Sequence, residues 1–222
     1  MYRRNDYILD LIEQISMVIA DIIGLKKSKK FEEVQKLVDV NLKKFLGLNE
    51  NTIHKLSYKD LMNIISVNSE YDVSKCIILA ELLHQEGDVY EAQGETTKSY
   101  DMYIKSINIF IEVLLLEKGK LLQQYIFRVD EIEEKVRKYE IPYESESLLF
   151  KFYETIGRFG KAEDMLFEML DWGVRKEDTY EAGIAFYENL AKKSEAELVE
   201  GNFSLHEVEE GMNKFKQYFT KQ

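Results

Sequence analysis

Residues that break helices or form cross-links are scarce in this chain of 222 residues. It contains one proline, Pro142, one cysteine, Cys76, and eleven glycines. A single cysteine excludes an internal disulfide framework and any zinc site built from several cysteines. Because each strand of a meander needs turn residues every several positions, so few breakers disfavour a β-rich fold. These absences favour an all-helical fold with short connections.

Long apolar runs and low-complexity tracts are also lacking. No uninterrupted apolar stretch approaches the length that spans a bilayer, and no tract rich in Pro, Ser or Gly marks a linker. The first residues superficially suggest a signal peptide, because two arginines precede apolar residues. However, Asp6, Asp10 and Glu13 interrupt the run, and no small-residue cleavage site follows. We therefore expect a cytoplasmic protein that does not enter a membrane.

Positive charge is in deficit, most clearly after residue 60. The formal net charge is −11. The first 60 residues carry eleven Lys and Arg against nine acidic residues, and the rest of the chain carries 19 against 32. A surface this acidic repels a phosphate backbone. The N-terminal part lacks the tight glycine turn of a helix-turn-helix reader, so we expect no nucleic-acid partner.

Patterns typical of a catalytic or cofactor site are absent. The chain has neither a phosphate-binding loop nor the glycine pattern of a dinucleotide site. Its three histidines suggest no triad, and Cys76 lies in a helical pattern where a buried structural thiol is the simpler interpretation. Glu81-x-x-His84 has the spacing of di-iron bundles, but those sites need two such pairs. We expect no catalytic residue, cofactor or metal, although a pocket between helices would allow an enzyme without a recognisable motif.

Helical periodicity dominates what is present, beginning with an N-terminal segment over residues 1–68. A second helix is expected over residues 31–46, and a short third one after Ser57 with Leu61, Ile64 and Ile65 inward. The first helix, over residues 6–24, has an apolar face wide enough for either a core position or self-association. Isoleucines and one leucine at helical spacing make this face: Ile8, Leu11, Ile12, Ile15, Ile19, Ile22 and Ile23.

The stretch 148–170 predicts a hairpin of two helices. Its apolar residues fall on one face before Gly157 and on a second face after Gly160, and glycine tolerates the positive φ of a helix C-cap. Neither apolar face is fully covered by the other, so the hairpin needs stacked neighbours, as in a helical repeat. A long helix from about residue 71, a break near Gly94 and a second long helix predict a similar pair earlier in the chain.

Both pairs fit the register of the tetratricopeptide repeat at several positions. Glu86 stands where that family has Leu, Phe150 stands where a small residue is usual, and no proline closes the first unit. The matching residues share large, small or aromatic character: Leu83, Gly87, Tyr90, Ser99, Tyr103 and Ser106 in the first pair, and Leu149, Tyr153, Phe159, Ala162 and Leu166 in the second. The region 69–222 therefore resembles a tetratricopeptide-repeat protein, and the whole chain is similar to uncharacterised bacterial proteins of about this length.

The resemblance implies an all-α fold in which antiparallel hairpins stack as a short right-handed superhelix. The N-terminal segment 1–68 would pack on the repeat region 69–222 in one continuous domain. An extra helix is expected between the two pairs, over residues 121–139. Its charged residues suggest a solvated outer surface: Asp130, Glu131, Glu133, Glu134, Lys135, Arg137 and Lys138.

The same register implies a concave groove in which relatives hold an extended peptide or a partner helix. Six residues would face it: Glu81, His84, Asp88, Glu91, Lys151 and Glu154. We expect a non-enzymatic helical-repeat protein that binds a protein or peptide there, with a basic or mixed-charge partner favoured by complementarity. An ordinary solvated face is the alternative for each residue.

Two other functions remain open. A self-assembling structural protein, for instance a homodimer, would use the first helix and the aromatic face of the last one (Met212, Phe215, Tyr218 and Phe219). A sensor of a small ligand or of a signalling peptide would instead use a pocket between helices.

Overall fold

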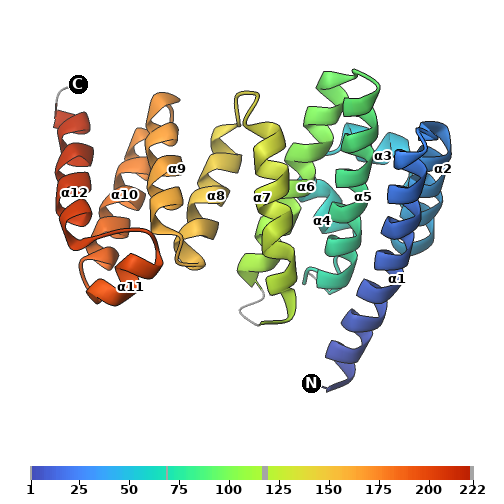
Figure 1. The fold of residues 1–222 in the computed structure, drawn as a ribbon, viewed down its shortest axis with the longest axis horizontal. Coiled ribbons are helices and arrows are strands. Elements are labelled where there is room, and N and C mark those ends of the chain that lie inside the picture. The colour runs from blue at the N-terminus through green and yellow to red at the C-terminus, as the bar shows by residue number, and fades with distance from the viewer. Residues whose placement is uncertain (1, 69, 117–119, 221–222) are drawn as a thin grey trace. The chain divides into compact units, whose positions relative to one another are not determined.

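The computed structural model describes residues 2–68, 70–116 and 120–220, and side chains except those of residues 2–9, 120–122 and 220. Within these ranges helices pack against one another and no strand forms, which confirms the all-α class (Figure 1). The chain divides into two compact units, Met1–Glu140 and Ile141–Gln222. No helix in the described ranges is long and apolar enough to cross a membrane.

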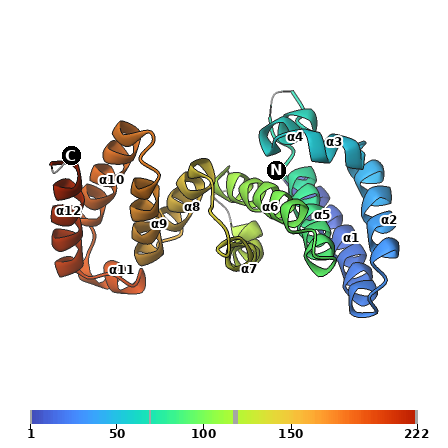
Figure 2. The same ribbon diagram turned by 90° about the horizontal axis from the view of Figure 1, so that it is seen from above.

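The first unit is organised around helix α5, against which α1, α2 and α6 pack. Figure 2 shows α3 and α4 carrying the chain from α2 to the α5–α6 pair. The elements follow one another as α1 (Tyr2–Lys27), α2 (Phe31–Asn41), η1 (Leu42–Leu46), α3 (Glu50–Lys55), α4 (Tyr58–Ile64), α5 (Val73–Ala92), α6 (Thr96–Leu116), η2 (Lys120–Tyr125) and α7 (Ile126–Val136).

Helix α5 is buried around most of its circumference, and small residues let α6 approach it closely. A Cβ atom on Gly87 would lie 2.6 Å from Cε1 of Tyr103. The hydroxyl of Ser106 donates to the carbonyl of Ala80 over 2.7 Å. Gly87, Tyr103 and Ser106, which were expected to pack between these two helices, therefore lie in the interface between α5 and α6. The stacking of the pairs as a tetratricopeptide-like superhelix stays a prediction.

The N-terminal segment belongs to the first unit, so the expected division at residue 68 falls inside it. Helix α1 packs on α5, and both Ile15 and Ile22 are at most 1% exposed. Ser57 accepts a hydrogen bond from the amide of Asp60, which confirms the predicted N-cap. Ile64 was expected to face inward and this is wrong, because it is 53% exposed at the end of the short α4.

The second unit begins with the predicted hairpin, whose first helix starts directly after Pro142. Gly157, with a φ of +76°, ends that helix as expected, whereas Gly160 lies inside the next one. Phe215 of the last helix is fully buried. The elements are α8 (Tyr143–Thr155), α9 (Phe159–Asp171), α10 (Lys176–Leu190), α11 (Glu195–Glu200) and α12 (Leu205–Thr220).

Candidate ligand pocket between α1, α5 and α7

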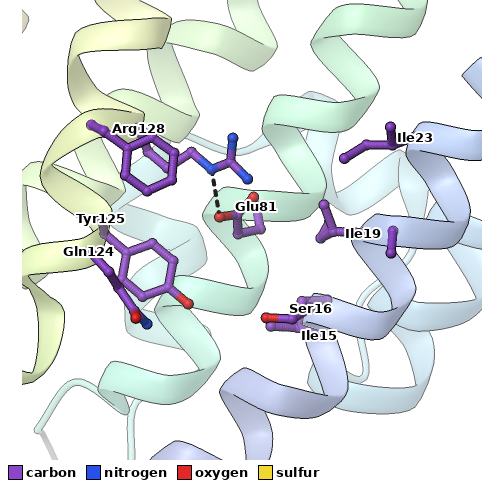
Figure 3. Close-up of a pocket in the computed structure, with 10 residues that line it drawn as sticks. Ile15, Ser16, Ile19, Ile23, Glu81, Gln124, Tyr125 and Arg128 are labelled. Atoms are coloured by element: carbon purple, nitrogen blue, oxygen red, sulfur yellow. Dashed lines mark hydrogen bonds and ion pairs between the residues drawn. The ribbon is translucent and has the colours of Figure 1, made fainter. Parts of the chain in front are cut away.

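A pocket of about 300 Å³ opens between α1, α5 and the segment formed by η2 and α7, all within the first unit (Figure 3). Its walls are mostly apolar because α1 contributes isoleucines one helical turn apart. Polar groups come from α5, η2 and α7. The lining residues are Ile15, Ser16, Ile19, Ala20, Ile23, Glu81, Gln124, Tyr125, Phe127 and Arg128. Apolar walls with a few convergent polar groups are the usual composition of a ligand site.

The carboxylate of Glu81 forms the polar end of this pocket. Nε of Arg128 donates to Glu81 Oε1 over 3.0 Å, whereas the buried Oε2 has no hydrogen-bond partner among the described residues. Burial raises the pKa of Glu81, and the neighbouring Arg128 guanidinium acts in the opposite direction. A buried acceptor without a donor costs about 1–3 kcal/mol. This end of the pocket therefore holds a carboxylate oxygen whose hydrogen-bonding capacity is unused among the described residues.

The rim of the pocket is apolar and open to solvent. Phe127 is 54% exposed and Ile23 is 37% exposed. The guanidinium of Arg128 lies over the ring of Phe127, 4.9 Å from its centroid. Tyr125 is buried, and this burial raises the pKa of its hydroxyl to about 12, so the group stays protonated near neutral pH. An incoming apolar group would thus meet isoleucine and phenylalanine surface before it reaches the carboxylate.

Asp88, two turns further along α5, joins three elements of the first unit. Its carboxylate accepts hydrogen bonds from the ammonium groups of Lys26 on α1 and Lys135 on α7, each over 2.5 Å. The hydroxyl of Tyr103 on α6 donates to the same carboxylate over 2.7 Å and lies 3.0 Å from Glu91 Oε2. Charge-assisted hydrogen bonds of this kind are roughly twice as strong as neutral ones. The network therefore ties α1, α6 and α7 to the central helix.

The charge of Asp88 follows from these partners. Burial alone would raise the pKa of this carboxyl, but His84 and the ammonium groups of Lys26 and Lys135 bring it well below its usual range. Burial lowers the pKa of His84 to about 4, so the imidazole is neutral at pH 7. At neutral pH the two lysines are consequently the groups that keep Asp88 charged.

His84 lies deeper than any other histidine of the chain. Its side chain is 1% exposed, and neither ring nitrogen has a hydrogen-bond partner among the described residues. Asp88 and Glu131 lie 3.8 and 3.9 Å from Nε2, beyond hydrogen-bonding distance. The imidazole also contacts the ring of Tyr103, at a centroid distance of 6.0 Å. Because solvent has almost no access to its side chain, this histidine is a packed core residue.

The six residues expected to face the groove differ in how far they are exposed to solvent. Glu81 and His84 are buried, and Asp88 is covered by Lys26 and Lys135. Glu91 keeps a side-chain exposure of 36% beside Lys138. In the second unit, Lys151 is exposed and Glu154 is half-buried. Burial raises the pKa of Glu154, against a hydrogen bond from Asn189. Partner binding by these six residues stays a prediction, but Glu81 and His84 do not form an open surface.

The solvated surface expected for residues 121–139 holds for Glu134, Arg137 and Lys138, which are exposed, but it is wrong for the buried Glu133. Arg128 and Lys135 lie seven positions apart and reach Glu81 and Asp88, which are also seven positions apart on α5. Glu133 is 2% exposed and pairs with Arg137 at 2.6 Å. The matching period of opposite charges on the two helices was the available sequence signal, because positions seven apart lie on the same helix face.

No curated protein and no solved structure matches this chain. A model of one family matches residues 1–220, which is nearly the whole length. The chain belongs to this family, DUF6483, which is described as a family of unknown function.

Proposed function

We propose that this chain is a non-enzymatic helical protein that binds a segment of another polypeptide in the pocket between α1, α5 and α7. The observation that carries the proposal is the combination of apolar walls with the buried Oε2 of Glu81, which has no donor among the described residues. Such a pocket discriminates in favour of a group that is apolar along its length and carries a donor at its end.

The energetics support an anchor side chain of a partner. Burial of an aliphatic or aromatic side chain against Ile15, Ile19 and Phe127 contributes about 1.5–3 kcal/mol. A donor that reaches Glu81 Oε2 relieves the cost of the unpaired acceptor. The net charge of −11 supports a basic or mixed-charge partner, because complementary charge speeds association and disfavours acidic competitors.

Binding rather than catalysis is supported by the state of the candidate reactive groups. Cys76 is buried and the pKa of its thiol is raised to about 12 by burial, so thiolate is rare near pH 7. His84 is buried, and neither of its ring nitrogens has a hydrogen-bond partner among the described residues. A nucleophile and its base need to lie within hydrogen-bonding distance of one another, and His84 makes no such contact with a described residue.

Filling the pocket tests the proposal. Ala20 is an exposed residue of α1 that lines the pocket, so the indole of Ala20→Trp would fill the pocket. Met17→Trp is the matched control, because Met17 lies on the same helix and is 60% exposed. A photo-crosslinking residue in place of Phe127 would report which polypeptide reaches the rim. We expect one crosslinked partner to be lost in Ala20→Trp and kept in Met17→Trp. Equal crosslinking in both variants would contradict the proposal.

A second candidate is a sensor of a small amphipathic molecule, and the pocket volume favours it. About 300 Å³ is at the lower end of the range typical of small-molecule sites. Octylamine is a suitable probe because it has an apolar tail and an ammonium donor, and octanoate is its control. A rise in the unfolding temperature with octylamine, absent with octanoate and absent in Ala20→Trp, would support a small ligand. Crosslinking to a polypeptide without such a rise would favour the first proposal.

Self-assembly also stays a prediction, and the structure narrows the surfaces that it would use. Phe215, one of the expected contact residues, is fully buried, and Tyr218 donates a hydrogen bond to the carbonyl of Leu170 over 3.2 Å. Met17 on α1 is 60% exposed and remains accessible. Light scattering over a range of concentrations measures the oligomeric state, and a constant monomer mass would end this hypothesis.

A further inference from the structure

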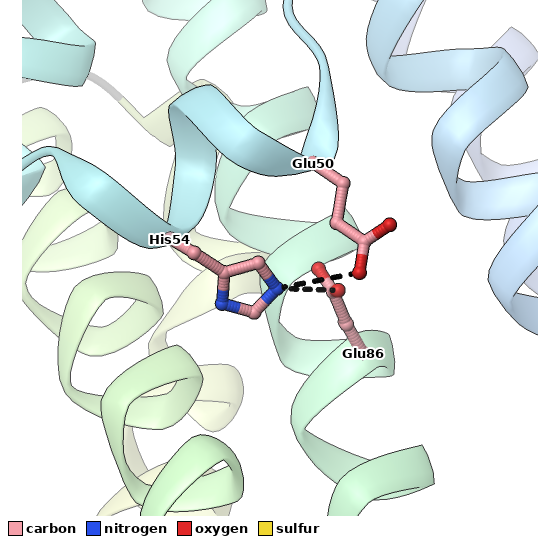
Figure 4. Close-up of side chains that lie close together, drawn as sticks. All are labelled: Glu50, His54 and Glu86. Atoms are coloured by element: carbon pink, nitrogen blue, oxygen red, sulfur yellow. Dashed lines mark ion pairs between the residues drawn. The ribbon is translucent and has the colours of Figure 1, made fainter.

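Three side chains that can bind a metal ion come together where α3 meets α5 (Figure 4). Glu50 and His54 belong to α3, and Glu86 belongs to α5. Nε2 of His54 lies 3.7 Å from Glu50 Oε1 and 3.5 Å from Glu86 Oε1. One ligand atom from each residue lies within 4.8 Å of both others. This cluster is separate from the pocket of α1, α5 and α7.

Local structure fixes two of these side chains on one face. Glu50 and His54 are four positions apart in α3, so their side chains lie on the same side of that helix. A hydrogen bond ties α3 to α6, because the ammonium of Lys105 on α6 donates to the carbonyl of Ile53 on α3 over 2.9 Å. The same ammonium pairs with Asp101 at 2.7 Å. Its charge is therefore compensated, and it has no lone pair to offer a metal.

Glu86 is the unusual member of the cluster. Its side chain is 5% exposed, and its Oε2 is buried without a hydrogen-bond partner among the described residues. Oε1 accepts a hydrogen bond from the hydroxyl of Tyr90 over 3.2 Å, and the same hydroxyl lies 3.2 Å from Nε2 of His54. A buried carboxylate is costly unless a positive charge or several donors compensate it. Figure 4 shows this carboxylate turned toward the imidazole of His54 and the carboxylate of Glu50.

We propose that Glu50, His54 and Glu86 form a binding site for a divalent cation of the zinc class, completed by water as a fourth ligand. Zinc bonds to nitrogen and oxygen are about 2.0–2.2 Å long, so ligand atoms of a tetrahedral site lie about 3.3–3.6 Å apart. The two distances from His54 Nε2, 3.5 and 3.7 Å, are close to this range without rearrangement. Tyr90 would act as an outer hydrogen-bond donor to Glu86.

The donor set selects the class of metal. One imidazole and two carboxylates suit zinc and the neighbouring transition metals, whereas calcium and magnesium prefer oxygen ligands alone. The simpler arrangement without metal is an ion pair between a protonated His54 and the two carboxylates. A hydrogen bond to Glu86 raises the pKa of His54, against its burial, so a proton competes with the metal for Nε2. Bound metal would connect α3 directly to the central helix α5.

Titration of the full-length chain with Zn²⁺ by calorimetry at about pH 8, where protons compete less for the imidazole than at pH 7, tests the proposal. We expect one equivalent to bind, and Co²⁺ in its place to give the intense visible bands of a tetrahedral complex. Zn²⁺ should also raise the unfolding temperature, because it binds the folded state. Glu50→Gln, His54→Ala and Glu86→Gln should each weaken binding by at least about tenfold.

The chain offers a matched control and a variant with little risk of misfolding. His206 and Glu210 are also four residues apart, and Nδ1 of His206 lies 3.8 Å from Oε2 of Glu210. However, the side chain of His206 is 78% exposed, and it belongs to no cluster of three possible ligands among the described residues. His206→Ala should therefore bind like the wild type. Glu50 is 62% exposed, so Glu50→Gln should fold normally, which circular dichroism would verify. Lack of saturable binding by the wild type, or unchanged affinity in His54→Ala, would overturn the proposal.

Discussion

The ring of Tyr103 lies directly against the backbone of Gly87, in the space that any larger residue would need. A Cβ atom on Gly87 would lie 2.6 Å from Cε1 of Tyr103, a separation at which one of the two must shift. The ring has little freedom to move, because its hydroxyl is bound to Asp88 at 2.7 Å and the residue is buried in the core. The contact between α5 and α6 therefore depends on a glycine at this position.

Gly87→Ala should destabilise the protein despite the better helix propensity of alanine. Overpacking typically costs about 1–3 kcal/mol, and alanine returns about 1 kcal/mol in a helix, so we expect a net loss of up to about 2 kcal/mol. Gly24→Ala is the matched control, because nothing lies within 4 Å of the position that its methyl group would take in α1. It should stabilise the chain by about 0.5–1 kcal/mol. Guanidinium unfolding followed by circular dichroism measures both, and similar effects of the two variants would contradict the contact.

Asp88→Asn should be strongly destabilising, because it removes the carboxylate that two partly buried ammonium groups share. Among the described residues, Lys26 would keep only the side-chain oxygen of Gln85, and Lys135 would keep Glu91 at 3.3 Å. Lys26 and Lys135 have side-chain exposures of 19% and 23%, so water replaces the lost partner only in part. Removal of one member of such a pair costs about 2–4 kcal/mol. Asp39→Asn is the control, since its pair with Lys43 is exposed and should contribute less than about 0.5 kcal/mol. Equal losses in urea unfolding would show that the network is no stronger than a surface pair.

Cys76 should resist alkylation until the protein unfolds. Its side chain is buried, and burial followed by the charge of Asp72 raises the pKa of the thiol to about 12. An ordinary thiol has a pKa of about 8.5, so near pH 8 the folded chain holds roughly a thousandfold less thiolate. We expect iodoacetamide to react at least that much more slowly with the native chain than with the chain in guanidinium. Comparable rates would mean that Cys76 is accessible.

The same shift predicts how stability depends on alkaline pH. The folded pKa lies above the unfolded one, so the contribution of Cys76 is fully present below about pH 8.5 and is lost as pH rises toward 12. Stability of the wild type should therefore fall over this window. Cys76→Ala should reduce the slope, whatever its effect on stability at pH 7. An unchanged slope in this variant would assign the decline to other groups.

The local patterns of the sequence were sufficient for the helices but not for their surroundings. Gly157, Ser57 and Gly87 act through neighbouring backbone or one adjacent helix, and their roles were predictable from residue type and spacing. The charged residues of α5 were expected to face a groove because the resemblance to the tetratricopeptide register implies one at these positions. Instead α1 and α7 cover Glu81 and Asp88 with basic residues, and this pairing depends on tertiary contacts.

The candidate metal site shows the same limit. Glu50 and His54 are four positions apart, a helical spacing that can be recognised in the sequence. These are the two members of the cluster that the sequence pattern can bring together. Glu86 comes from another helix, at a position where the tetratricopeptide register has Leu, and this departure by itself indicates no partner for the carboxylate. The fold brings the three together because α3 lies against the α5–α6 pair, to which the hydrogen bond from Lys105 to Ile53 ties it.

In the second unit, Gly183 of α10 and Phe215 of α12 repeat the relationship between a glycine and a covering ring. A Cβ atom on Gly183 would overlap Cζ of Phe215, which is fully buried and contacts the rings of Tyr180 and Tyr187. Overpacking in Gly183→Ala should therefore cost about 1–3 kcal/mol, less about 1 kcal/mol that alanine gains in a helix. Phe215→Leu alone should cost about 1–3 kcal/mol, because it removes buried ring surface and leaves space.

The two substitutions together should be less harmful than their sum. Leucine at position 215 vacates part of the volume that a methyl group at position 183 would enter, so the double variant should recover at least about 1 kcal/mol. Four proteins, the wild type, both single variants and the double variant, complete the cycle by guanidinium unfolding. If the losses in stability of the two single variants add up in the double variant, α10 and α12 move apart enough to accommodate the methyl group whether or not the ring is present. A positive coupling would instead place the packing of α12 in the stable core of the second unit, and so would remove Phe215 from the residues available for self-assembly.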